Sequence, residues 1–120
     1  MASDPYHESL DLLTEETRNM HRAIVSLMEE LEAIDWYQQR ADACSNPRLR
    51  DVLLYNRSEE IEHATMLSER IRRHNERFNE TMRKHLFTEQ PITGIEKGAQ
   101  TEGPAASTAE TLGIGRTKDK

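Results

Sequence analysis

The sequence contains few of the residues that cross-link or interrupt a fold. Among its 120 residues there is one cysteine, aromatic residues make up 5%, and glycine and proline are nearly absent before residue 90. The single Cys44 cannot form an intramolecular disulfide, so a reducing cytoplasm is the expected compartment. No apolar run is long enough for a signal peptide or a membrane span. We therefore expect one small helical domain with no membrane partner.

Basic residues are fewer than acidic residues. The chain carries 22 acidic and 16 basic side chains, which gives a formal net charge of -6. A nucleic-acid-binding domain normally has a basic face that neutralises phosphates. The charge balance therefore argues against nucleic acid as a partner and favours an acidic helical protein.

What the sequence does contain is a long helical pattern. From Leu10 to about Arg40, apolar positions recur at alternating steps of three and four, with a threonine filling the one gap. This is a heptad seam, the pattern of a helix that packs along another helix. The seam residues are Leu10, Leu13, Thr17, Met20, Ile24, Leu27, Leu31 and Ile34.

A short break follows the first helix. Either Ser45 or Asn46 can cap a second helix, and Pro47 suits its first turn. The second helix is expected from about Pro47 to His74, and a third, shorter one from about Glu76 to Phe87. Because the connection between the two long helices is short, we predict an all-α antiparallel hairpin followed by a short C-terminal helix.

The composition changes near residue 90, where glycine and proline arrive with threonine, serine and alanine. We expect residues 1–90 to form the helical domain and residues 91–120 to be a flexible tail. Near its end the tail carries an apolar island, Leu112-Gly113-Ile114-Gly115. Such islands often dock in a groove on a partner, although four residues can also arise by composition alone.

A Glu-x-x-His pair lies in the middle of the second helix. Glu60 and His63 fall within roughly 60° of each other around the helix, on its apolar face, whereas Glu59 and Glu62 point away. We therefore expect Glu60 and His63 to point into the core rather than to lie on a solvated face. A buried carboxylate needs a compensating charge or ligand, which favours a metal over a purely structural hydrogen-bond network.

The first helix offers a third ligand. Glu30 lies at the edge of the seam, about 80° from a seam centre that falls near Leu31, and is the best-placed carboxylate to join Glu60 and His63. A di-iron site in a four-helix bundle takes one Glu from each of two helices and one Glu-x-x-His from each of the other two. One chain supplies half of this set. We therefore predict a bundle and a metal site that are both completed by dimerisation.

At these residues the sequence resembles a known family, the encapsulated ferritins, which are ferritin-like ferroxidases packaged inside encapsulin nanocompartments. The resemblance covers about residues 8–95 and is specific because it is a long ordered run. It is carried by His21–Ser26, Met28–Ala33, Asp35–Tyr37, Asn56–Arg57, Glu59–Glu60, Glu62–Ala64 and Leu86–Thr93.

The resemblance implies a ferroxidase centre, with two iron ions per dimer interface, built by Glu30, Glu60 and His63 from two chains. It places Trp36 near that centre and Tyr37 close by. It also implies that Glu29 and Glu32 are outer carboxylates, which attract iron on its way to the centre.

The resemblance further implies a ring of five dimers that has no storage cavity of its own. Iron is then oxidised in the ring and mineralised in the surrounding shell, in the bacterial cytoplasm. The island Leu112-Gly113-Ile114-Gly115 resembles the peptide that docks cargo on the encapsulin shell. This sequence departs from the usual pattern at Arg116-Thr117, where a small and a second apolar residue are common.

Two functions are compatible with these residues. The first is iron oxidation at the centre. The second is a structural helical adaptor, whose Glu-His pair binds zinc or fixes the register of the helices and whose tail recruits the partner.

Overall fold

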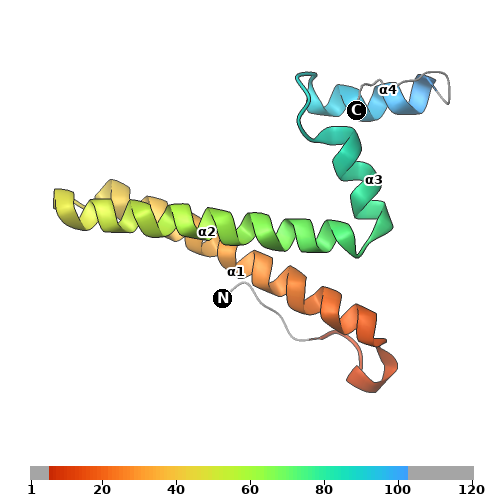
Figure 1. Ribbon diagram of the computed structural model, residues 1–120, viewed down its shortest axis with the longest axis horizontal. Helices are drawn as coiled ribbons and strands as arrows, with labels where there is room; N and C mark the ends of the chain where they lie inside the picture. The colour runs from red at the N-terminus through yellow and green to blue at the C-terminus, as the bar shows by residue number, and fades with distance from the viewer. Residues whose placement is uncertain (1–5, 103–120) are drawn as a thin grey trace. The chain divides into compact units, whose positions relative to one another are not determined.

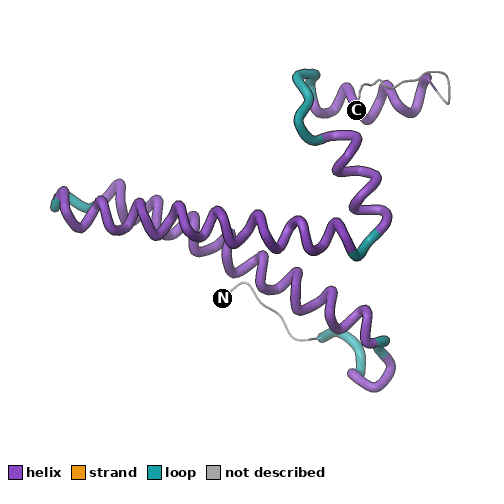
Figure 2. The backbone as a smooth tube through the Cα atoms, viewed as in Figure 1, coloured by secondary structure: helices purple, strands orange, loops and turns teal. Residues whose placement is uncertain are grey.

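The computed structural model describes residues 6–102, and every regular element within that range is a helix (Figure 2). The prediction of an all-α fold is therefore confirmed. No helix in this range is long and apolar enough to cross a membrane. The chain divides into two compact units between Asn79 and Glu80, and each is described by itself. In chain order the helices are η1 (Leu10–Leu12), α1 (Glu15–Ala43), α2 (Pro47–Arg73), α3 (Glu76–His85) and α4 (Ile92–Glu102) (Figure 1).

The first long helix begins later than the heptad pattern suggests. Thr14 has an extended backbone, with φ -71° and ψ 161°, and its hydroxyl accepts a hydrogen bond from the backbone N–H of Thr17 at 3.0 Å. This is an N-cap, so α1 starts at Glu15. Leu10 belongs to the short 3₁₀ helix η1 instead of to α1. The heptad pattern extends back to Leu10, but the cap at Thr14 separates the short turn of η1 from α1.

The connection between α1 and α2 is as short as predicted. It consists of Cys44, Ser45 and Asn46, and α1 and α2 pack against each other as an antiparallel hairpin (Figure 1). Of the two candidate caps, the structure uses Asn46. Its side-chain oxygen accepts hydrogen bonds from the backbone N–H groups of Arg48 and Leu49, both at 3.0 Å.

The hairpin buries few apolar side chains. Only three of its described hydrophobic residues are buried: Ala41 is 1% exposed, Ile71 is 3% and Ala64 is 7%. Counting from these residues in heptad steps of three and four gives the stripe along which each helix faces the other. On α1 the stripe is Met20, Ala23, Leu27, Glu30, Ile34, Tyr37 and Ala41, and on α2 it is Leu53, Arg57, Glu60, Ala64, Leu67 and Ile71.

Between Met20 and Ile34, the predicted seam differs from this stripe at two positions. Ile24 is 38% exposed and Leu31 is 54% exposed, so neither is enclosed by the other helix of the hairpin. Glu30 occupies the stripe position between Leu27 and Ile34. The heptad pattern thus merges two apolar faces of α1, one against α2 and one that remains open in the single chain.

Two differences from the prediction lie in the C-terminal part. Helix α3 ends at His85 instead of Phe87, because Phe87 adopts a positive φ of 62° that an α-helix cannot contain. Within the segment that was expected to be a flexible tail, Ile92–Glu102 forms the helix α4. The carbonyl of Pro91 accepts hydrogen bonds from Gly94 and Ile95 at 3.0 and 3.1 Å, and Ile95 is 9% exposed.

Candidate metal centre

Three side chains with metal-binding atoms converge at the middle of the hairpin. Glu30 comes from α1, and Glu60 and His63 come from α2. One ligand atom of each lies within 4.8 Å of the others. The Nδ1 atom of His63 is 3.1 Å from Oε1 of Glu60 and 3.5 Å from Oε1 of Glu30. Within residues 6–102 this is the only group of three or more acidic, histidine or cysteine residues with this geometry.

Helix geometry explains why these residues meet. Glu60 and His63 are three positions apart on α2, so their side chains leave the helix on one face. Glu30 and Glu60 both lie on the stripes along which α1 and α2 face each other. The hairpin therefore brings together the three residues that the sequence analysis selected as a metal site.

The burial of the group differs from the prediction. The side chains of Glu60 and Glu30 are 24% and 26% exposed, and that of His63 is 48% exposed. The expectation that Glu60 and His63 point into the core is therefore wrong for the single chain. Two helices can cover only one side of the stripe, so the group opens to the surface of the hairpin.

The three groups shift one another's protonation. Hydrogen bonding to the Glu60 carboxylate, helped by partial burial, raises the pKa of Glu30 above 4.5. The same contact with Glu30, together with His63, lowers the pKa of Glu60. Hydrogen bonding to Glu60 and the charges of both carboxylates raise the pKa of His63 above 6.5. Opposite shifts of this kind are typical of two carboxyl groups in contact, and the raised pKa of His63 reflects the two carboxylates beside it.

The donor set fits a metal ion. Oε1 of Glu30 is a buried oxygen that has no hydrogen-bond partner in the described part of the chain. Two carboxylates and one imidazole are the ligands that iron, manganese and zinc accept. They provide fewer donors than a six-coordinate ion needs, and none of the described neighbours completes the set.

The other residues predicted to serve this site lie outside the group of three. Glu29 is exposed and Glu32 is partly covered, on the turn of α1 that contains Glu30. Trp36, which is 44% exposed, and Tyr37 lie farther along α1. The Arg40 guanidinium lies 5.8 Å from the Trp36 ring centre and 5.5 Å from that of Tyr37. The residues Leu112, Gly113, Ile114 and Gly115 of the predicted docking peptide lie outside the described range.

One polar link beside the site was not predicted from the sequence. Arg57, one turn before Glu60 on α2, donates a hydrogen bond to Oε1 of Gln38 on α1 at 2.5 Å. This contact joins Arg57, on the stripe of α2, to Gln38, which follows the stripe residue Tyr37 on α1. Its signal in the sequence is a charged residue at a stripe position, three residues before a predicted ligand.

A helical hairpin that presents two carboxylates and an imidazole from facing helices defines a class, the carboxylate–histidine metal-binding proteins with a helical-bundle fold. Comparison with known sequences narrows this class. The profile of the EncFtn-like family matches residues 5–89, and the chain belongs to that family.

The chain is also similar to two named relatives over nearly its whole length. It is 48% identical to an encapsulated ferritin-like protein of Rhodospirillum rubrum, covering 98% of this chain and 90% of the relative. It is 44% identical to a ferritin-like protein of Thermotoga maritima, covering 93% and 96%. A crystal structure of a protein from Nitrosomonas europaea matches with a TM-score of 0.72 and 52% identity, over 74% of this chain and 98% of that one.

Proposed function

We propose that this protein is a ferroxidase. It oxidises Fe(II) to Fe(III) with oxygen at a di-iron centre formed by Glu30, Glu60 and His63 of two chains. The observation that carries the proposal is the convergence of their ligand atoms within 4.8 Å on one hairpin. Fe(II) is the substrate, and the names of the two ferritin-like relatives support iron as the metal.

A second chain accounts for both the open site and the open apolar face. His63 shares one heptad stripe of α2 with three large apolar residues, Leu49, Val52 and Met66, which are 52%, 55% and 62% exposed. Ile24 and Leu31 are exposed on α1. A second copy related by a two-fold axis would cover these side chains, complete a four-helix bundle and double the ligand set.

The chemistry follows from the ligands. Carboxylate oxygens are hard donors, and they stabilise ferric iron relative to ferrous iron. Each Fe(II) gives one electron, so a site that holds two ions side by side supplies oxygen with an electron pair. In this proposal the chain's own contribution is to position the carboxylates and to keep His63 oriented through its contact with Glu60.

The proposal also includes the oligomeric state of the protein and its protein partner. The chain forms a homo-oligomer, a ring of five dimers, inside an encapsulin shell in the bacterial cytoplasm. The word "encapsulated" in the name of the Rhodospirillum rubrum relative supports the shell as the partner. The segment Leu112-Gly113-Ile114-Gly115 docks on the shell, Glu29 and Glu32 deliver iron, and Trp36 and Tyr37 lie close to the centre.

Anaerobic loading with Fe(II), followed by addition of oxygen, tests the proposal. Wild-type protein should consume oxygen and develop ferric absorbance, and native mass spectrometry should show iron bound to an even number of chains. Glu60→Ala and His63→Ala should abolish oxygen consumption and weaken the dimer. Glu62→Ala, an exposed glutamate of the same helix, is the matched control. Wild-type rates in the Glu60 and His63 variants would exclude the proposal and favour the structural adaptor.

A further inference from the structure

Phe87 combines two features that are rarely found together. Its φ of 62° is the one positive value among the described residues other than glycine, and its side chain is fully exposed. A bulky residue in this region is strained, and such strain often marks a site of interaction. Neighbouring Leu86 is 45% exposed, so the end of α3 presents an apolar edge to solvent. The proposed iron chemistry makes no use of this edge.

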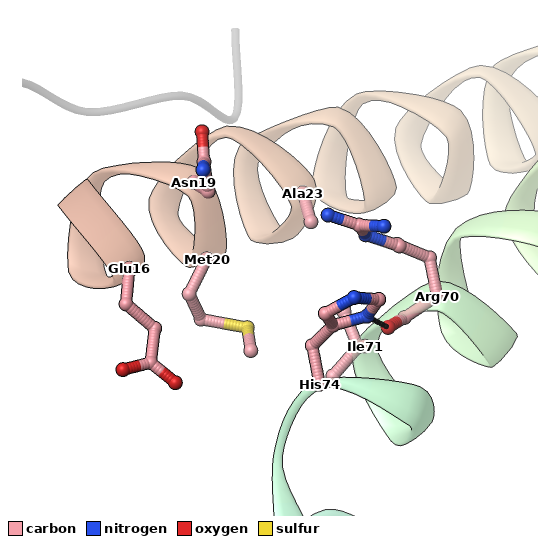
Figure 3. A pocket seen from close by; sticks show the side chains of 7 residues that line it. All are labelled: Glu16, Asn19, Met20, Ala23, Arg70, Ile71 and His74. Atoms are coloured by element: carbon pink, nitrogen blue, oxygen red, sulfur yellow. Dashed lines mark hydrogen bonds between the residues drawn. The ribbon is translucent and has the colours of Figure 1, made fainter.

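A pocket of about 300 Å³ lies at the open end of the hairpin, where the start of α1 faces the end of α2 (Figure 3). Met20, Ala23 and Ile71 give it an apolar lining. Its polar rim is divided by charge, with Glu16 on the α1 side and Arg70 and His74 on the α2 side. The Arg70 guanidinium reaches across toward Ala23, and Nδ1 of His74 lies 3.1 Å from the carbonyl oxygen of Arg70.

We propose that the Phe87 ring of one copy of this chain fills this pocket in a second copy. A cavity of about 150 Å³ is large enough to bind benzene, so the pocket of about 300 Å³ has room for a phenyl ring and part of its backbone. The Arg70 guanidinium at its rim would meet the ring face in a cation–π contact. The apolar lining would remove the ring from water.

The charges around Phe87 and around the pocket are complementary, which supports the proposed contact. Phe87 is flanked by two exposed residues of opposite charge, Lys84 in the last turn of α3 and Glu89 in the segment after it. The pocket has the matching pair, Glu16 on one side and Arg70 on the other. A ring inserted between them can therefore place Lys84 toward Glu16 and Glu89 toward Arg70.

We assign the pocket to a second copy because a rigid helix, α3, separates the pocket residue His74 from Phe87 along the chain. His74 lines the pocket, and α3 begins two residues later and runs for 10 residues. At 1.5 Å per residue, this helix separates its two ends by about 15 Å. In the sequence, Phe87 follows the far end of this helix, and the trapping experiment tests whether the ring comes from a second copy or from the same chain. The contact involves none of Glu30, Glu60 and His63, so it is independent of the proposed iron chemistry.

Disulfide trapping between two chains tests this contact. Both chains carry Cys44→Ser, so that the native cysteine cannot react. Chains with Thr88→Cys are mixed with size-tagged chains with Asn19→Cys, at a residue that lines the pocket. The mixture is then oxidised gently in the absence of metal. We expect a mixed disulfide at a rate about tenfold above that of a Thr88→Cys and Arg48→Cys mixture. Arg48 is exposed at the opposite end of α2. Equal rates in the two mixtures would overturn the proposal. It would also be overturned if a single chain that carries both cysteines formed an intramolecular disulfide between them.

Two variants of Phe87 test whether its ring anchors the contact between chains or whether the residue matters only for the local backbone. Phe87→Ala and Phe87→Gly should both slow the trapping reaction about tenfold, because either change removes the ring. Phe87→Gly should also preserve or raise thermal stability, because glycine tolerates the positive φ. Leu12→Ala, at another exposed apolar residue, is the control. Unchanged trapping in both Phe87 variants would mean that the ring does not fill the pocket.

Discussion

Nδ1 of His63 lies 3.1 Å from Oε1 of Glu60, one turn earlier on the same helix. This contact orients the imidazole before any metal arrives, and it raises the pKa of His63 above 6.5. Below that pKa, a metal ion would have to displace the proton that the two carboxylates favour on His63. Binding at this site should weaken as the pH falls through the pKa of His63.

The pKa of His63 is the first prediction. Glu60→Gln removes the carboxylate that contributes most to the shift, so the pKa of His63 should fall toward 6.5. NMR titration of the metal-free protein measures this directly. Glu62→Gln is the control and should leave the His63 titration in place. A His63 pKa that is unchanged in Glu60→Gln would show that the contact does not control its proton.

Self-association through the open apolar face is the second prediction. Leu31 is 54% exposed on α1, and a charge there would have to be buried in the proposed two-fold interface. Leu31→Glu should raise the dissociation constant of the dimer roughly tenfold or more while the helical content stays the same. Sedimentation and circular dichroism measure the two quantities. Leu12→Glu, at a 74% exposed residue of η1, should change neither.

Iron delivery is the third prediction. Glu29 and Glu32 lie on the turn of α1 that contains Glu30, but neither belongs to the group of three. If they attract Fe(II), replacing both with alanine should lower the oxidation rate several-fold at low iron and leave it unchanged at saturating iron. Alanine variants of Glu62 and Glu76, both exposed, change the net charge equally. An unchanged rate at every iron concentration would exclude the delivery role.

The hairpin was predictable because its signals are local. Pro47 and the short break mark the connection, and the spacing of Glu60 and His63 is enough to place both on one face. The choice between Ser45 and Asn46 was not predictable, because either side chain can cap a helix. The cap depends on which oxygen reaches the free N–H groups, and the structure shows that this is Asn46.

The faces of α1 could not be separated from the sequence. Ile24 and Leu31 fit the same heptad pattern as Leu27 and Ile34, yet they are exposed in the single chain. Periodicity identifies apolar positions but not which neighbour covers them. The positive φ of Phe87 had no sequence signal either, because such a turn usually contains glycine.

The Asn46 cap is the fourth prediction. Its side chain satisfies two N–H groups that would otherwise lack partners, at 3.0 Å each. Asn46→Ala should therefore lower the free energy of unfolding by about 1 kcal/mol. Ser45→Ala, one residue earlier, should have a much smaller effect. Thermal or urea unfolding of both variants measures the difference, and equal losses would contradict the assignment of the cap.

The fifth prediction concerns the end of α2. Arg72 and Arg73 both donate hydrogen bonds to Glu69, at 2.9, 2.7 and 2.7 Å, and Arg72 also donates to Asn79. These contacts lower the pKa of Glu69 from 4.5 to about 2. Because the folded pKa lies below the unfolded one, the resulting stabilisation is complete above pH 4.5 and is lost as the pH falls toward 2.

Glu69→Gln should therefore lower the melting temperature at neutral pH, and the difference from wild type should shrink as the pH is reduced below 4.5. Glu69 is 39% exposed, so solvent screening keeps the effect small, and added salt should reduce it further. Glu62→Gln, at an exposed position of the same helix, provides the baseline. A difference between Glu69→Gln and wild type that stays constant from neutral pH down to pH 3 would mean that the stabilisation comes from packing, because an ionic contact would lose part of its contribution once Glu69 of the unfolded chain takes up a proton below pH 4.5.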